Sequence, residues 1–359
     1  MEHMRVREYG SEFDWGANIR YITPNAQPPL IKDALLVRSG RDALFAIAQK
    51  HRDEYRRVLL PALCCTAMVT PFMKNGYELV FYQMTDDLAP DVYDIRNKLA
   101  GKTLLVYMDF FGAPSLTTEQ MVWIRGFGDV LFIQDRTHDL LTGGQVESIS
   151  DFKVASIRKW MALADGGLLH ASVGDLDKSV RDEDSRFSNM RASALEHKRI
   201  YLQTGNLGMK ERFRAEFRWA NEILEEADEC RTMSTTTQNL LSHIDLSAIL
   251  RQRLSNVKAL RELLSGIPEI QDAVPCPERS ALYYPVLVSN RDKVQSMMAG
   301  LGVYCPVIWP IPEPARGICK MAQKISEYML ALPCDQRYSP EDMEFICGAL
   351  QQSMEELVG

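Results

Sequence analysis

Short apolar runs alternate with amphipathic stretches between Ser39 and His170. The runs occupy residues 58–60, 79–81, 104–107, 130–133 and 168–169. This alternation is typical of strands joined by crossover helices in a layered α/β fold. Because a strand that is covered on both faces is apolar throughout, we expect a mainly parallel sheet. Ligands of such sheets bind beyond the carboxyl ends of the strands.

The second half of the chain has a different pattern. Mixed charges replace the aliphatic runs between Arg181 and Arg218, which predicts an exposed connection that leads into a helix. Apolar residues then recur at helical spacing from Leu246 to Leu264, and Gly266 stands where a glycine ends many helices. From this change we expect a large domain with an N-terminal segment at residues 1–200 and a smaller C-terminal α/β domain at residues 201–359.

Further elements are expected in the small domain. Two apolar runs, at residues 283–288 and 303–308, predict strands on either side of a helix at residues 292–301. Ser339 followed by Pro340 combines an N-cap with a proline at the first helical position. This pair predicts a last helix that runs to about residue 357.

Composition and charge argue against several classes of protein. The 359 residues are 46% hydrophobic and 25% charged, which is ordinary for a globular protein. The 41 basic and 48 acidic residues give 41 − 48 = −7, so nucleic acid is not an expected partner. No apolar run is long enough to span a bilayer and residues 1–26 contain no signal-peptide core, which predicts a cytoplasmic protein. The cysteines and histidines lack metal-site spacing, so we expect no metal.

Candidate catalytic residues follow the predicted strands. Asp135 comes directly after the apolar run at 130–133, and His138 lies three residues later. Lys159 follows Asp135 by 159 − 135 = 24 residues. These residue types match what pyridoxal phosphate chemistry requires. The amine of Lys159 would hold the cofactor and act as a base, Asp135 would keep the pyridine nitrogen protonated, and His138 would hydrogen-bond near the phenolate oxygen.

The phosphate of such a cofactor needs a site of its own. Ser39, Gly40 and Arg41 open an amphipathic stretch, and the N–H groups at a helix start can bind a phosphate. Ser156, three residues before Lys159, is the second candidate for this role.

Each of these features also has a plainer explanation. A lysine is usually a solvated surface group, an aspartate after a strand is often a turn residue or a helix cap, and a single histidine is more often structural than catalytic. On spacing alone, an α/β protein without a pyridoxal site stays an open alternative.

Taken in order, the residues resemble motifs of the DegT/DnrJ family of pyridoxal phosphate aminotransferases, many of which act on keto sugars attached to nucleotides. The stretch from Ser39 to Leu44 is similar to the family's Ser-Gly-x-x-Ala-Leu helix start, and Gln134 to His138 is similar to its Glu-Asp-x-x-His/Gln motif. Lys159 is followed, as in the family, by paired glycines seven and eight positions later. Leu59-Leu60-Pro61 and Leu330-Ala331-Leu332-Pro333 resemble further family elements. The resemblance covers most of the chain and implies the aspartate-aminotransferase fold.

The sequence departs from the family at positions around the expected cofactor. Cys65 stands where many relatives carry the aromatic residue that stacks on the ring, so the stacking partner stays open although Cys65 is expected near the cofactor. Val154 replaces the family's phosphate-binding serine, a role that Ser156 could take. The family's Gly-x-Asn-x-Arg segment, which reaches into the partner subunit's site, has no clear match between Thr204 and Asn239.

The resemblance implies a homodimer that transfers an amino group from glutamate or a similar donor to a nucleotide-linked keto sugar, in the synthesis of cell-surface polysaccharide or related compounds. Two alternatives stay open: elimination, decarboxylation or transfer to a non-sugar ketone, and a non-catalytic relative that binds a ligand. A nucleotide diphosphate would need extra cations, although basic residues more often form a solvated face. The candidates are Lys198, Arg199, Lys210, Arg212, Arg214 and Arg218.

Overall fold

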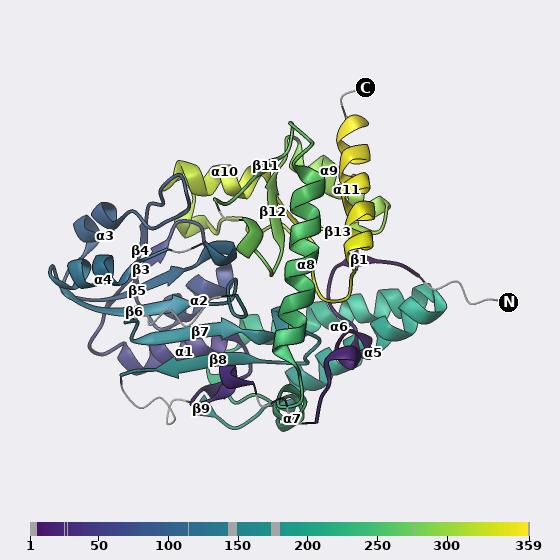
Figure 1. Cartoon of the computed structure of the whole chain (residues 1–359). Coiled ribbons are helices and arrows are strands. Elements are labelled where there is room, and N and C mark those ends of the chain that lie inside the picture. Colours follow the sequence, from purple (N-terminus) through teal and green to yellow (C-terminus); the bar gives the residue numbers. More distant parts are fainter. Residues whose placement is uncertain are drawn as a thin grey trace.

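The computed structural model describes residues 6–24, 26, 28–113, 115–142, 149–173, 180–275 and 277–357. A central sheet with helices on both faces forms the larger α/β part, on the left of Figure 1. Helix α8 (Leu246–Leu264) stands between this sheet and the C-terminal helices α9 (Arg291–Gly300) and α11 (Pro340–Glu355).

The central sheet of the described chain has the strand order β2-β8-β7-β6-β5-β3-β4. Neighbouring strands from β7 to β4 are parallel, whereas β8 runs antiparallel to both β7 and β2. The expected mainly parallel sheet is therefore confirmed. The strands are β2 (Leu35–Val37), β3 (Arg57–Pro61), β4 (Glu78–Tyr82), β5 (Lys102–Met108), β6 (Asp129–Asp135), β7 (Phe152–Ser156) and β8 (Gly167–Ala171).

Helices bury both faces of the sheet, which explains the continuous apolar runs. Alternate residues of a strand point to opposite faces. On β5, Leu104 and Val106 pack in the core that contains residues of α1 and α2, whereas Leu105 and Tyr107 pack in the core that contains residues of α3 and α4. The helices are α1 (Gly40–His51), α2 (Thr66–Lys74), α3 (Val92–Lys98) and α4 (Thr118–Arg125).

The exposed connection predicted between Arg181 and Arg218 is wrong, because most of this stretch is helical. Helices α5 (Ser185–Thr204) and α6 (Leu207–Glu226) form a pair, joined by a turn at Gly205. Phe213 and Phe217 of α6 pack with Ala194 and Leu195 of α5. The charged residues that suggested a loop lie mostly on the outer faces of this pair. The domain boundary proposed at residue 200 falls inside α5.

The C-terminal part contains a small antiparallel sheet of β11 (Gln271–Asp272), β12 (Tyr284–Leu287) and β14 (Met329–Leu332). Side chains of α8, α9 and α11 form a second core with this sheet. Helices α8, α9 and α11 confirm the predicted helices, and β12 confirms the first predicted strand. The strand expected at 303–308 is shorter, because β13 (Val303–Tyr304) ends before Pro306, which has no N–H to donate.

The remaining elements are short or lie at the edges of the two parts. The N-terminal strand β1 (Tyr9–Gly10) pairs in parallel with β13, which ties the start of the chain to the C-terminal part. The others are η1 (Trp15–Tyr21), η2 (Pro29–Ile31), η3 (Phe110–Gly112), η4 (Ile157–Lys159), β9 (Val180–Arg181), β10 (Cys230–Arg231), α7 (Thr235–Leu241), η6 (Pro277–Arg279), η7 (Glu313–Ala315) and α10 (Lys320–Tyr328).

The described residues show neither a membrane-spanning helix nor a metal cluster. None of their helices combines the length and the apolar composition that a bilayer crossing requires. No group of three or more His, Cys, Asp or Glu side chains in the described ranges is arranged to hold a metal ion.

Candidate active site

A cavity of 270 Å³ lies at the carboxyl ends of the central strands. Met108 ends β5, Asp135 ends β6 and Ser156 ends β7, and all three line this cavity. The wall brings together most of the residues singled out in the sequence, namely Ser39, Gly40, Arg41, Cys65, Asp135, Ser156 and Lys159. The topology explains this, because parallel strands deliver their carboxyl ends to one edge of the sheet.

Asp135 is a buried carboxylate that β6 fixes at the cavity wall. It accepts a hydrogen bond of 2.9 Å from the backbone N–H of Thr137. Burial raises the pKa of Asp135, and the hydrogen bonds from Thr137 and the charge of Lys159 oppose that rise. The Thr137 hydroxyl in turn accepts the N–H of Ser156 at 3.0 Å, so the ends of β6 and β7 are held together.

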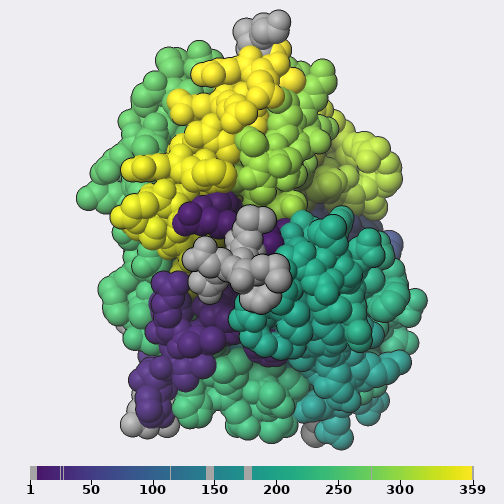
Figure 2. All heavy atoms as spheres, turned by 90° about the vertical axis from the view of Figure 1, so that its right-hand side faces the viewer, coloured from purple at the N-terminus to yellow at the C-terminus, as the bar shows by residue number. Residues whose placement is uncertain are grey.

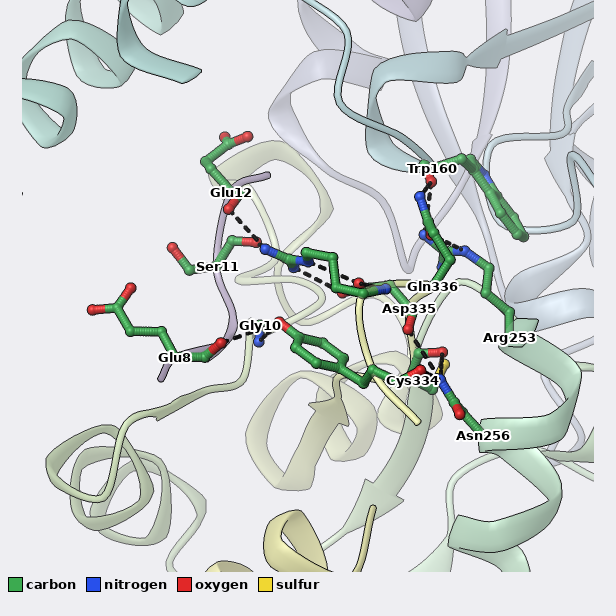
Figure 3. Close-up of polar contacts among 12 residues, drawn as sticks. Glu8, Gly10, Ser11, Glu12, Trp160, Arg253, Asn256, Cys334, Asp335 and Gln336 are labelled. Carbon is green, nitrogen blue, oxygen red and sulfur yellow. Dashed lines mark hydrogen bonds and ion pairs between the residues drawn. The ribbon is translucent and has the colours of Figure 1, made fainter. Parts of the chain in front are cut away.

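Lys159 ends the turn η4, directly after β7, and its side chain is half-buried on the cavity wall. The next residue, Trp160, is fully buried. Its carbonyl accepts hydrogen bonds from Arg253 Nη2 at 2.8 Å and from Gln336 Nε2 at 3.0 Å, and Figure 3 shows both side chains converging on it. Its indole N–H donates to the carbonyl of Thr137 at 2.7 Å. The backbone beside the lysine is therefore fixed to both parts of the molecule.

The glycine pair after Lys159 allows a close approach of two backbones. A side chain on Gly167 would place its Cβ 2.3 Å from the carbonyl carbon of Ser39 and 2.6 Å from the N of Gly40. Gly166 has φ +138°, which side chains rarely tolerate. The pair therefore lets the start of α1 sit against β8, with Gly40 and Arg41 at the cavity wall.

The cavity has the charges that pyridoxal phosphate would need at its two ends. Buried nitrogen atoms of Arg41 and Arg158 near the start of α1 lack hydrogen-bond partners in the described structure, which suits a phosphate. The Asp135 carboxylate suits a protonated ring nitrogen, and the Lys159 amine lies on the wall of the same cavity. The residues present thus fit the cofactor.

His138 is placed beside the cavity rather than on its wall. It is fully buried, and its ring centroid lies 4.6 Å from that of Phe111 and 5.1 Å from that of Trp309. Burial and the charge of Lys159 hold the pKa of His138 well below its usual range, so the ring is neutral. Its Nδ1 is buried without a partner among the described residues.

Several residues of the site carried no signal that the sequence patterns could detect. Trp309, in the proline-rich segment after β13, supplies an aromatic face to the cavity that Cys65 cannot supply. Asn221, Leu224 and Glu225 reach the wall from α6, a helix that the sequence did not predict. Arg253 belongs to the predicted helix α8, but its contact with the Trp160 carbonyl joins elements far apart in the sequence and left no local signal.

The basic residues considered for a nucleotide do not form one cluster. Lys198 and Arg199 line a second cavity of 710 Å³ between the N-terminal segment, α5 and the segment before α11. Figure 2 shows these three segments meeting on one face, in purple, teal and yellow. Lys198 donates to the Glu12 carbonyl, and Arg199 forms an ion pair with Glu196. Lys210 and Arg212, which do not line this cavity, bind Glu8 and Glu216 respectively. Arg214 and Arg218 are exposed on α6.

Comparisons with known structures support the fold at low sequence identity. Spr1654 of Streptococcus pneumoniae, a candidate sugar aminotransferase solved in its PLP form, matches with a TM-score of 0.68 and 15% identity over 98% of this chain and 99% of that chain. Helicobacter pylori PseC, an aminotransferase involved in the biosynthesis of pseudoaminic acid, matches with a TM-score of 0.66 and 13% identity over 98% and 100%. The aminotransferase TlmJ of Streptoalloteichus hindustanus gives 0.66 and 17% over 99% and 100%.

A family model gives the stronger assignment. No curated protein sequence matches the chain significantly. The model of the DegT/DnrJ/EryC1/StrS aminotransferase family matches residues 31–351, which include the whole central sheet and the cavity wall. The PLP-dependent aminotransferase fold and the cofactor expected from the sequence are thereby confirmed. The chain belongs to the DegT/DnrJ/EryC1/StrS aminotransferase family.

Proposed function

We propose that this enzyme transfers an amino group from glutamate or a similar donor to a nucleotide-linked keto sugar, in the synthesis of cell-surface polysaccharide or a related compound. The observation that carries the amino-transfer chemistry is the shared cavity wall of Lys159 and Asp135. Membership of the family and the likeness to Spr1654, a candidate sugar aminotransferase, support a sugar as the acceptor.

The residues of the cavity have distinct roles in this proposal. Ser39, Gly40, Arg41 and Ser156 would lie at the phosphate end of the cofactor and Asp135 at its ring nitrogen. When bound, the cofactor supplies an electron sink for the substrate carbon that loses a proton. The amine of Lys159 would move that proton from the carbon of the donor to the cofactor carbon, and in the second half of the reaction it would move a proton from the cofactor carbon to the acceptor. His138 would stay a neutral hydrogen-bonding group beside the site.

Apolar side chains would keep water from the reacting atoms. Met108, Cys65, Leu224 and Trp309 line the same cavity as Lys159. Burial raises the pKa of the Cys65 thiol, so this residue is expected to act as a neutral packing group. A dry site strengthens the interaction of Asp135 with a protonated ring nitrogen.

The size of the cavity bears on where the nucleotide binds. A volume of 270 Å³ is near the lower end for small-molecule pockets, so the cofactor and the sugar would occupy most of it. The nucleotide would then lie outside the cavity. Lys198 and Arg199, on the wall of the 710 Å³ cavity, are the predicted cations that remain candidates for its diphosphate.

The assembly and location are also part of the proposal. We expect a homodimer with its sites near the interface, working in the cytoplasm on small-molecule substrates. Light scattering tests the assembly, because an enzyme that is fully active as a monomer would contradict shared sites.

The deciding experiment is a half-reaction. The enzyme is first converted with glutamate to its pyridoxamine phosphate form. Keto sugars are then added with and without the attached nucleotide. Recovery of the original absorption spectrum only with nucleotide-linked sugars supports the proposal. If simple keto acids restore the spectrum and every nucleotide sugar fails, or if product analysis finds elimination or decarboxylation, the acceptor is wrong.

A further inference from the structure

We propose that two arginines, Arg41 and Arg158, bind the phosphate of the cofactor as a pair and take the place of hydroxyl side chains. Both residues line the 270 Å³ cavity with Lys159 and Asp135. Arg41 is the second residue of α1, and Arg158 lies in η4 directly before the lysine. The inference rests on the cofactor and on Lys159 as its attachment point, not on the identity of the acceptor.

Both guanidinium groups have N–H donors that make no hydrogen bond within the described structure. Nε and Nη1 of Arg41 and Nε of Arg158 are buried and have no hydrogen-bond partner among the described residues. Buried polar groups are almost always paired, so atoms of this kind indicate a ligand that supplies acceptors. The three oxygens of a phosphate accept several hydrogen bonds from planar guanidinium groups.

The charge around this end of the cavity is positive. Burial lowers the pKa of Arg158 to about 10, and the nearby cations Arg191 and Arg41 contribute to the decrease. Burial also lowers the pKa of Arg41, against the charge of Glu225 on the same wall. A dianion placed beside Arg41 and Arg158 would offset both the cost of burying their positive charges and the repulsion between them.

Two of the carboxylates near this end, other than Glu225, are already engaged by other arginines. Asp42 forms an ion pair of 2.7 Å with Arg38, and Glu12 forms one of 3.0 Å with Arg191. Nε and Nη1 of Arg191, whose charge also acts on Arg158, are themselves buried without partners in the described part of the chain. The structure thus holds more positive charge here than its own acids neutralise.

Ser156 contributes a hydroxyl-bearing side chain to the wall at this end, whereas the other hydroxyl groups are occupied or missing. The Ser39 hydroxyl bonds the Asp42 carboxylate and also caps α1 by accepting the N–H of Asp42 at 3.1 Å. The Thr137 hydroxyl accepts the N–H of Ser156. Position 154 carries a valine. Beside Ser156, the arginine pair therefore supplies donors in place of the hydroxyls that this sequence lacks or uses elsewhere.

The experiment compares two ligands that differ only in the phosphate. Cofactor-free protein is titrated with pyridoxal phosphate and with pyridoxal, and the Kd of each is measured by absorbance and by protein fluorescence. Arg158→Met and Arg41→Met should each raise the Kd for pyridoxal phosphate by about 10- to 100-fold, because each removes charge-assisted hydrogen bonds. The Kd for pyridoxal should stay the same. Arg56→Met, at an exposed position before β3, is the matched control and should change neither.

Further measurements guard against a folding artefact. Arg158→Lys keeps the charge but loses the planar fork, so its Kd for pyridoxal phosphate should lie between those of wild type and Arg158→Met. If Arg158→Met does not fold, the Kd of Arg158→Lys for pyridoxal phosphate tests the proposal instead. Inorganic phosphate should compete with pyridoxal phosphate in the wild type and more weakly in the variants.

The proposal is overturned if the variants keep the wild-type preference for pyridoxal phosphate over pyridoxal, or if they lose both ligands equally. These outcomes are separate from those of the acceptor assay. An enzyme that binds its cofactor through the arginines yet rejects every nucleotide sugar would disprove only the proposed function.

Discussion

The indole ring of Trp309 lies over the amine of Lys159, with 6.0 Å between Nζ and the ring centroid. Trp309 comes from the segment between β13 and α10, whereas Lys159 follows β7 of the central sheet. The same indole contacts His138 and lies 6.2 Å from Phe110, centroid to centroid. An aromatic residue from the C-terminal part thus faces the lysine from a direction that the motifs around Cys65 do not suggest.

We predict that Trp309→Ala raises the KM of the substrates by about tenfold, because an aromatic face contributes about 0.5–1.5 kcal/mol beyond its buried area. Trp309→Phe keeps an aromatic face and should retain most of the affinity. Steady-state kinetics with each variant tests this. Unchanged KM values for donor and acceptor in Trp309→Ala would show that the indole does not contact substrate. Cofactor binding should also quench the tryptophan fluorescence of the wild type, and this quenching should be smaller in Trp309→Phe.

Asp135→Asn should bind the cofactor and lose most of its turnover, by about 100-fold or more. The amide has the shape of the carboxylate but cannot hold a protonated ring nitrogen by charge. Binding is measured from the cofactor absorbance and turnover from amino transfer. Transfer at the wild-type rate would mean that Asp135 is not the partner of the ring nitrogen.

Lys159 should carry the cofactor. Reduction of the loaded enzyme with borohydride, followed by peptide mapping, should place the label on the peptide that contains Lys159. Lys153 lies on the neighbouring strand β7 and serves as an internal control. A label on Lys153 or on another lysine would disprove the assignment.

Local patterns predicted most of the sheet and much of the cavity wall. Apolar runs located β3, β4, β5, β6 and β8, because a strand that is covered on both faces leaves a continuous apolar signature in the sequence. Strand ends and turns then located Asp135 and Lys159, since parallel topology brings such positions to one edge.

Long-range contacts were beyond the reach of these patterns. The α5–α6 pair was mistaken for a loop because its buried residues are spread over two long helices among many charges. The contribution of Leu224 to the site depends on how that pair packs, which no local spacing encodes. Trp309 reaches the cavity through irregular backbone between prolines.

Gly167→Ala should destabilise the protein by about 1–3 kcal/mol, because its methyl group would collide with the backbone of Ser39 and Gly40 and force α1 away from β8. Gly348 provides a matched control, since it lies exposed in α11 and a methyl group added there would meet no described atom within 4 Å outside its own helix turn. Gly348→Ala should stabilise by about 0.5–1 kcal/mol through helix propensity. Urea unfolding of both variants measures the difference. Equal effects at the two positions would contradict the close approach at Gly167.

Lys198 should make stability depend on pH above neutrality. Its side chain is almost fully buried, and burial together with the charge of Arg337 lowers its pKa from the usual 10.5 to about 8, against the attraction of Glu8, Asp14 and Glu12. The Lys198 ammonium donates a hydrogen bond to the carbonyl of Glu12.

The sign of the effect follows from proton counting. Between pH 8 and pH 10.5 the folded protein has released the lysine proton while the unfolded chain still holds it, so the unfolded state binds more protons. The contribution of Lys198 to the free energy of unfolding must therefore increase with pH across this window. Lys198→Met removes the titrating group and with it this increase. Urea unfolding of wild type and variant at several pH values from about 7 to about 10 isolates the contribution, because groups common to both proteins cancel in the difference. The wild type should gain stability relative to the variant as the pH rises, and parallel profiles would show that the buried amine keeps its ordinary pKa.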